Sequence, residues 1–207
     1  MQLGRVVAVN VVARVTPGYF GDTAIDKRPV MGPVEVGELG VAGDRQLSRV
    51  HGGRDKAVYA YAIEDAQWWA AELGREIPPG LFGENLRTSG IDVTGALIGE
   101  RWRINEVVLE VRLPRNPCEN LSLQMGIEHF HCRFNATGRV GAMLAVVTRG
   151  VIESGDEIVV EQRPDHDVTI GTMAIGPTRV QMQRLLDSGV PLARSVRSKA
   201  ERMVDRL

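Results

Sequence analysis

The sequence is short of cysteine and has no long apolar segment, and each absence excludes a class of protein. Its 207 residues include two cysteines, Cys118 and Cys132, which are too few for a disulfide framework. A reducing cytosol disfavours a bond between them, so free thiols are expected. No apolar run reaches the ~18–20 residues that span a bilayer, and the N-terminus shows no apolar signal core. We therefore expect a cytoplasmic protein that does not enter a membrane.

Lysine is also scarce, and charge of neither sign dominates. Only Lys27, Lys56 and Lys199 stand among the 25 basic residues, and the formal net charge is −1. This balance gives no argument for nucleic acid or an anionic membrane as a partner. The arginine bias is either genomic or suited to bidentate binding of phosphate or carboxylate. A hydrophobic fraction of 43% is enough to build a real core.

Short strands separated by glycine turns fill the first 165 residues. Valine-rich or alternating segments predict strands at residues 4–15, 34–36, 57–61, 101–104, 107–113, 142–148 and 157–162. Loops are expected at 16–22 and 23–29, and one early helix at 64–73 with Gly74 at its C-terminal cap. Many short strands with a single early helix predict a mainly β, closed or nearly closed barrel. The absence of βαβ repeats excludes a Rossmann fold.

The composition changes after Pro164. One further strand fits within 165–176, and two helices follow. Thr178 to Gln181 matches a capping box, Gly189 ends the first helix, and Pro191 suits the first turn of the second. We therefore divide the chain into a barrel domain at 1–165 and a C-terminal extension at 166–207, a strand and a helical hairpin. The hairpin packs on the barrel or on another subunit, so a homodimer is one expected assembly.

Cys118 is the first candidate for chemistry. It follows Pro117, and Arg115 lies three positions before it, at the end of a predicted strand. A neighbouring cation stabilises a thiolate, so the pKa of this thiol should fall below the free value of ~8.5. Soft sulfur also suits a soft or high-valent metal. The alternative is an inert buried cysteine, and local chemistry does not decide between the two.

Three polar loops offer further candidates. His51 precedes two glycines whose backbone amides can converge on an anion, although the spacing is not that of a Walker loop. Asn85 follows a glycine and can hydrogen-bond a heterocycle. One segment places a hydroxyl and two cations where they can grip phosphate: Thr23, Lys27 and Arg28. For each loop, a plain turn or a solvated connector is the alternative.

A zinc site and a serine hydrolase are both weaker interpretations. His129, His131 and Cys132 join Cys118 as four nitrogen or sulfur ligands of suitable type. However, the two histidines share a side only in a strand, where Cys132 faces away, and no CxxC or HxxxH spacing is present. No Gly-x-Ser-x-Gly elbow supports a hydrolase.

Taken in order, these segments resemble the MOSC family, the domain named for molybdenum-cofactor sulfurase C-termini. The likeness covers roughly residues 1 to 165 and is strongest to the bacterial hydroxylaminopurine reductase type. The matching segments are TAIDKRPV (23–30), GVAGDRQ (40–46), HGGRDKAVYAY (51–61), FGENL (82–86), PRNPC (114–118), GRVG (138–141) and GDEI (155–158). The resemblance implies a mostly β barrel with a pocket for a molybdopterin-type molybdenum cofactor.

The resemblance also implies roles for individual residues. Cys118 is the expected protein ligand to molybdenum. The groups expected to hold the pterin phosphate are Lys27 and Arg28 with the hydroxyl of Thr23, and Asn85 is a further cofactor contact. The residues expected to line the cofactor or substrate side are His51, Arg115 and Arg139. His51 is also the expected catalytic proton donor, because the pKa of histidine lies near neutral.

The implied activity is an oxidoreductase that reduces small N-hydroxylated or N-oxygenated compounds, such as hydroxylaminopurines. No flavin or iron–sulfur motif appears, so electrons are expected from a partner protein. Glu119 departs from the family pattern, because it puts an acid directly beside the proposed metal ligand. Two alternatives therefore stay open: a carrier of molybdenum cofactor or sulfur without turnover of its own, and a non-catalytic MOSC module.

Overall fold

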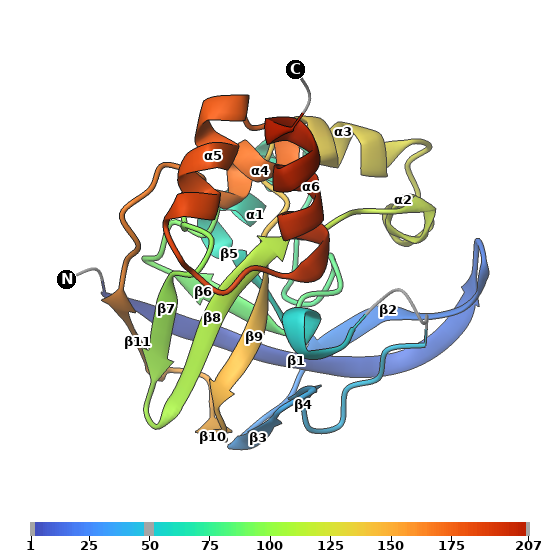
Figure 1. Ribbon diagram of the computed structural model, residues 1–207. Helices are drawn as coiled ribbons and strands as arrows, with labels where there is room; N and C mark the ends of the chain where they lie inside the picture. Colours follow the sequence, from blue (N-terminus) through green and yellow to red (C-terminus); the bar gives the residue numbers. More distant parts are fainter. Residues whose placement is uncertain (1–2, 48–51, 206–207) are drawn as a thin grey trace.

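The fold is a closed β-barrel with helices gathered at one end (Figure 1). The computed structural model describes residues 3–47 and 52–205. The barrel strands are β1 (Leu3–Gly18), β5 (Val58–Ala62), β6 (Leu86–Ser89), β7 (Arg101–Ile104), β8 (Val107–Pro114), β9 (Ala142–Thr148) and β11 (Glu157–Gln162). Neighbours follow the order β11-β7-β8-β9-β5-β6-β1, and pairing of β11 with β1 closes the ring. The predicted mainly β barrel is confirmed.

Strand β1 has 16 residues because its two parts pair with different strands. Its first part pairs with β11 and β6. Its second part leaves the barrel and pairs with β2 (Gly21–Pro29) in an antiparallel hairpin. The loops predicted at 16–22 and 23–29 were therefore wrong over most of their length. The segment carries buried polar residues such as Asp26 and Lys27 in place of an apolar alternation, so its strand character comes from pairing with β1.

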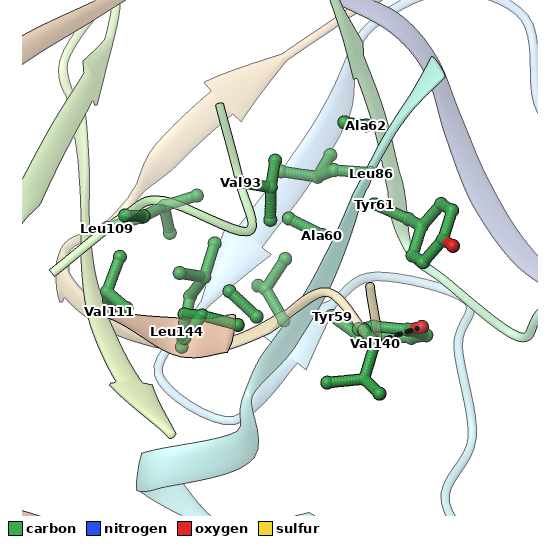
Figure 2. Close-up of a cluster of buried hydrophobic side chains, with 14 of the residues drawn as sticks. Tyr59, Ala60, Tyr61, Ala62, Leu86, Val93, Leu109, Val111, Val140 and Leu144 are labelled. Atoms are coloured by element: carbon green, nitrogen blue, oxygen red, sulfur yellow. Dashed lines mark hydrogen bonds between the residues drawn. The ribbon is translucent and has the colours of Figure 1, made fainter. Parts of the chain in front are cut away.

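The core fills the barrel from all sides (Figure 2). Every residue of β5 is buried, so both faces of this strand are covered by other parts of the fold. Its apolar neighbours in the core are Leu86, Val93, Leu109, Val111, Val140 and Leu144. Full burial of one such side chain contributes roughly 1.5–3 kcal/mol, so this cluster provides much of the stability that fixes the barrel wall.

Shorter elements connect the strands. Helix α1 (Ile63–Leu73) joins the parallel strands β5 and β6 and ends at Gly74 with φ 61°, as predicted. A small separate sheet contains β3 (Val34–Gly37), β4 (Gly40–Val41) and β10 (Gly150–Ile152), and a 3-10 turn (Arg54–Lys56) precedes β5. Two seven-residue helices that the sequence did not predict, α2 (Glu119–Met125) and α3 (Phe130–Ala136), follow β8.

Three helices form the C-terminal part: α4 (Ile170–Ile175), α5 (Arg179–Asp187) and α6 (Arg194–Val204). The capping box of Thr178 with Gln181 and the hairpin of α5 with α6 are confirmed. The strand predicted within 165–176 is wrong, because α4 occupies most of this stretch. Thr169, directly before α4, forms an isolated β-bridge with Leu97. Pro191 also lies before α6, whose N-cap is Ala193.

The division of the chain at residue 165 stays a prediction. Within residues 3–47 and 52–205, no helix has the length and apolar character needed to cross a bilayer.

Candidate functional site

A cavity of 280 Å³ opens where β2, β5, the end of β8 and the start of α2 meet. Five of the residues selected from the sequence line it: Thr23, Lys27, Asn85, Arg115 and Cys118. These residues come from three segments that lie far apart in the chain. Folding therefore brings a thiol, two cations, a hydroxyl and an amide to one space.

Cys118 is placed by the end of a strand and the start of a helix. The last pair of β8 joins Pro114 to Ala142, so the strand ends directly before Arg115. Cys118 is the N-cap of α2 and makes no side-chain capping bond to that helix. Its thiol is half-buried and faces the cavity. The short segment between β8 and α2 thus fixes the sulfur without using it for the fold.

Arg115 is buried beside aromatic rings and leaves one donor free. Its guanidinium lies 5.3 Å from the ring centre of Tyr59 and 6.0 Å from that of Phe134. Its backbone N–H donates to the carbonyl oxygen of Gly141, which anchors the segment to the start of β9. In the described part of the chain, its Nη1 is buried with no hydrogen-bond partner. A buried donor without an acceptor is costly, so an anionic ligand would fit here.

Lys27 is held in the same cavity by an acid that the sequence did not identify as its partner. Its Nζ lies 2.6 Å from Oδ2 of Asp44, and Nδ2 of Asn85 donates to the same oxygen at 2.8 Å. Burial lowers the pKa of the Lys27 amine; Asp44 opposes this effect, and the charge of Arg115 adds to it. Two cations, Lys27 and Arg115, therefore line one cavity, and their combined charge favours an anionic ligand.

Asn85 ties this site to the barrel. Its Oδ1 accepts from the backbone N–H of Tyr59 at 3.1 Å, and its backbone carbonyl accepts from the N–H of Asn10 at 2.6 Å. These contacts connect the segment before β6 to β5 and β1, while cofactor binding by Asn85 stays a prediction. The GVAGDRQ segment, which contains Asp44, was the sequence signal that could have identified this network.

Two other residues selected from the sequence, Arg28 and Arg139, do not line the cavity. Arg28 is largely exposed, 3.5 Å from Asp26, and does not line the cavity. Arg139 forms an ion pair with Asp65 of α1, lies 5.2 Å over the ring of Trp68, and is likewise absent from the cavity wall. His51 lies outside the described residues. Cofactor binding by these three stays a prediction.

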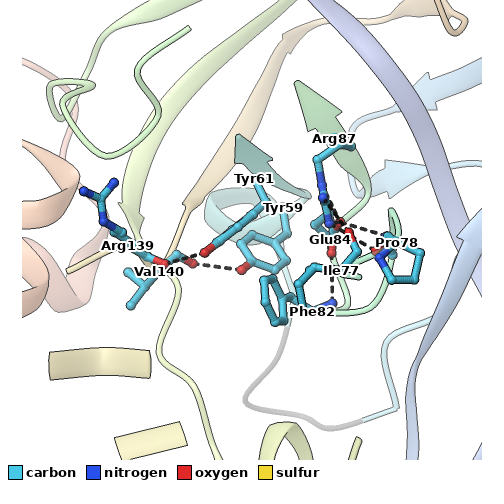
Figure 3. A network of polar contacts seen from close by, with 10 residues as sticks. Tyr59, Tyr61, Ile77, Pro78, Phe82, Glu84, Arg87, Arg139 and Val140 are labelled. Carbon is cyan, nitrogen blue, oxygen red and sulfur yellow. Dashed lines mark hydrogen bonds and ion pairs between the residues drawn. The ribbon is translucent and has the colours of Figure 1, made fainter. Parts of the chain in front are cut away.

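A second polar network lies next to the cavity but is closed to ligands (Figure 3). The buried carboxylate of Glu84 accepts from the backbone N–H groups of Gly80 and Phe82 and forms an ion pair with Arg87. Arg87 also donates to the carbonyl oxygens of Ile77 and Pro78. Both carboxylate oxygens of Glu84 and all three guanidinium nitrogens of Arg87 form hydrogen bonds within the fold. The network therefore holds the loop that contains Phe82 and Glu84 in place.

The histidine-rich segment near Cys118 is helical. His131 on α3 contacts the hydroxyl of Ser122 through Nδ1 at 2.9 Å and the thiol of Cys132 through Nε2 at 3.3 Å. Glu119 lies 3.7 Å from the same Nε2. In the described residues, no group of three or more histidine, cysteine, aspartate or glutamate side chains is arranged to hold a metal ion. The zinc alternative therefore gains no support.

Known proteins similar to this chain share one family. The family model described as MOSC domain matches residues 48–159. The chain is 31% identical over 169 residues to the uncharacterized protein YflK of Bacillus subtilis (strain 168), covering 80% of this chain and 76% of that protein. It is 33% identical over 153 residues to protein YiiM of Escherichia coli (strain K12), covering 72% and 67%. A protein named Reductase from Gibberella moniliformis is 34% identical over 158 residues, but the match covers 28% of that longer protein.

Solved structures agree with this relationship. The crystal structure of YiiM from Geobacillus stearothermophilus matches with a TM-score of 0.79 at 25% identity, covering 97% of this chain and 99% of that one. The crystal structure of YiiM from Escherichia coli matches with a TM-score of 0.74 at 25% identity, covering 96% and 91%. The similarity thus extends beyond the matched domain into the C-terminal helices.

Proposed function

We propose, since the chain belongs to the MOSC domain family, that it binds a molybdenum cofactor in the 280 Å³ cavity and reduces N-hydroxylated compounds there. The observation that carries this proposal is the placement of Cys118 and Arg115 on one cavity wall. The thiol of Cys118 is half-buried there and makes no capping hydrogen bond to α2. Beside it in the cavity lining, Nη1 of Arg115 is buried and has no hydrogen-bond partner among the described residues.

The residues present fit a group that is both thiophilic and anionic. Thiolate sulfur suits a soft or high-valent metal, which gives Cys118 the role of metal ligand. The phosphate of a pterin cofactor needs donors, and Arg115 and Lys27, which both line the cavity, can supply them. Thr23 adds a hydroxyl. The unused Nη1 of Arg115 is the contact that a bound phosphate would satisfy.

The chain's own residues bind and orient. Asp44 and Asn85 fix the amine of Lys27, and the segment between β8 and α2 fixes the Cys118 sulfur. When bound, the cofactor supplies two electrons that, with two protons, convert an N–OH group to N–H and water. His51 is the proposed proton donor, because the pKa of histidine lies near neutral; it lies outside the described residues.

The electrons come from a partner protein in this proposal. A small N-hydroxylated molecule is the substrate, and neither nucleic acid nor a membrane takes part. The name Reductase of the Gibberella moniliformis relative agrees with this class of reaction, although the match covers 28% of that protein. A homodimer remains a proposed assembly.

The test is a comparison of metal content between two cysteine variants. The wild-type protein, Cys118→Ser and Cys132→Ser are purified from a host that makes molybdenum cofactor, and bound molybdenum and pterin are quantified. Cys132 is exposed and does not line the cavity, so its variant is the matched control. We expect at least about a tenfold loss of molybdenum in Cys118→Ser and no loss in Cys132→Ser.

Turnover is measured separately with 6-hydroxylaminopurine and a dithionite-reduced dye as electron donor. Equal molybdenum in wild type and Cys118→Ser contradicts the ligand assignment. Metal without turnover favours a carrier of cofactor or sulfur, and absence of metal from every protein favours a non-catalytic module.

A further inference from the structure

Two exposed aromatic rings stand at the turn between β1 and β2. The exposed fractions of Tyr19 and Phe20 are 63% and 77%, and their ring centres lie 4.9 Å apart, edge to face. The chain contains three tyrosines, four phenylalanines and three tryptophans. All the others are buried or half-buried. Among the tyrosines, phenylalanines and tryptophans, all of which lie in the described residues, the two exposed ones are therefore neighbours on one turn.

This turn is fastened to the rim of the cavity. The backbone N–H of Tyr19 donates to Oδ1 of Asn120 at 2.7 Å, and Asn120 lines the cavity two residues after Cys118. A Cβ at Gly18 would lie 2.7 Å from the same oxygen, so glycine permits this close approach. Figure 1 shows the hairpin of β1 and β2 reaching out of the barrel toward α2.

The strand that leaves the turn continues into the cavity wall. Asp22 and Thr23 follow Phe20 directly, and both line the cavity. The aromatic pair therefore lies next to the rim that contains Thr23 and Asn120, although neither ring lines the cavity itself. Exposed aromatic rings are costly in water, so two rings held beside the opening of a cavity suit a ligand that extends out of the cavity and covers them.

We propose that Tyr19 and Phe20 form an aromatic platform that stacks a planar heteroaromatic ring of the substrate at the cavity mouth. The platform selects N-hydroxylated aromatic compounds over N-hydroxylated aliphatic ones. Aromatic side chains bind nucleobase-like rings through their π-faces with little dependence on the base. This inference rests on the proposed reductase function and names its substrate class.

A small ring fits this platform better than a protein partner does. Burying an aromatic side chain removes roughly 150–250 Å² from water, whereas a specific protein interface buries about 1,200 Å² or more. Two rings on a narrow turn supply a small part of that area. They do match the faces of a bicyclic heterocycle.

The test compares two substrates in one double variant, Tyr19→Ala with Phe20→Ala. The substrates are 6-hydroxylaminopurine and N-methylhydroxylamine, and the electron donor is a dithionite-reduced dye, so that no protein donor is involved. We expect KM for the purine to rise about tenfold, which corresponds to ~1.4 kcal/mol, with kcat little changed. KM for N-methylhydroxylamine should stay the same.

Two further variants serve as controls. Tyr19→Phe keeps the ring and should behave as wild type. Leu39→Ala removes another exposed apolar side chain, 64% exposed and away from the cavity wall, and should also leave both KM values unchanged. Unchanged purine KM in the double variant, or an equal rise for both substrates, overturns the proposal.

Binding of 6-aminopurine, measured by calorimetry on the same proteins, needs no turnover. About tenfold weaker binding in the double variant supports the platform even where the reductase proposal fails. Equal binding, or no binding to the wild type, overturns it.

Discussion

Two arginines lie against neighbouring tyrosines of β5, and their surroundings differ. Arg87 lies 5.7 Å from the ring centre of Tyr61, and Arg115 lies 5.3 Å from that of Tyr59. Both guanidinium groups are buried. Arg87 spends its donors on Glu84 and two backbone carbonyls, whereas Nη1 of Arg115 has no partner in the described part of the chain.

This difference separates a structural charge from a binding charge. Burying an arginine costs free energy unless the fold provides acceptors. The described fold provides acceptors for the donors of Arg87 but none for Nη1 of Arg115. The charge of Arg115 also acts on the buried amine of Lys27. We infer that the missing acceptor belongs to a ligand. Four variants test this contrast, in order of the stability change expected.

The largest loss of stability is expected for Glu84→Gln, in the buried network of Glu84 and Arg87. This substitution leaves Arg87 buried without its counter-charge, and breaking a buried ion pair from one side costs about 3–5 kcal/mol. The free energy of unfolding is measured by urea titration. The control is Glu161→Gln, which breaks an exposed pair with Arg103 at 3.3 Å and should cost less than about 1 kcal/mol. A similar small change in both variants would show that the closed network is not structural.

The two tyrosines that contact these arginines should lose the same stability when they are replaced by phenylalanine. The difference between the two sites then lies in the arginines. The hydroxyls of Tyr61 and Tyr59 donate to the carbonyl oxygens of Arg139 and Val140, each at 2.8 Å. At pH 8, Tyr61→Phe and Tyr59→Phe should each lose about 1 kcal/mol, because one hydrogen bond disappears.

At higher pH this loss should shrink. Burial raises the pKa of both phenols above the ordinary value, so the unfolded chain releases these protons first, near pH ~10. Wild-type stability therefore falls above that pH, by up to about 1.4 kcal/mol per pH unit and tyrosine. A phenylalanine variant lacks the part of this stability loss that comes from the replaced tyrosine, so its stability difference from the wild type becomes smaller. Urea titrations at pH 8 and pH 11 check it, and a constant difference between wild type and variant would contradict the burial of the phenols.

The sequence predicted those parts of the fold that depend on local patterns. The hairpin of β7 and β8, with its turn at Asn105, has strong alternation and a left-handed turn residue at φ 52°. Helix α1 has its own C-terminal glycine. Strand β2 has neither signal, and its pairing with β1 decides its structure. Helices α2 and α3 are short, and the N-cap residue of neither makes a side-chain capping bond, so no local pattern marked their start.

The candidate site follows the same division. Cys118 and Arg115 belong to one short motif, and the structure places both on the cavity wall. Asp44 was not identified as the partner of Lys27, because the two are 17 positions apart and meet only through the fold. The contact of Arg139 with Asp65 spans 74 positions and draws this arginine to α1. Motif membership thus selected five residues that line one cavity, but it could not give their partners within the fold.

The most direct test of the central claim is Arg115→Met, with stability and cofactor content measured on the same variant. The substitution removes a cation that the described fold leaves incompletely paired, so the cofactor-free protein should change by less than about 1 kcal/mol, the size of the lost contact with Tyr59. Bound molybdenum and pterin, from a host that makes the cofactor, should fall at least about tenfold. Wild-type cofactor content together with a large loss of stability would contradict the account and make Arg115 a structural residue like Arg87.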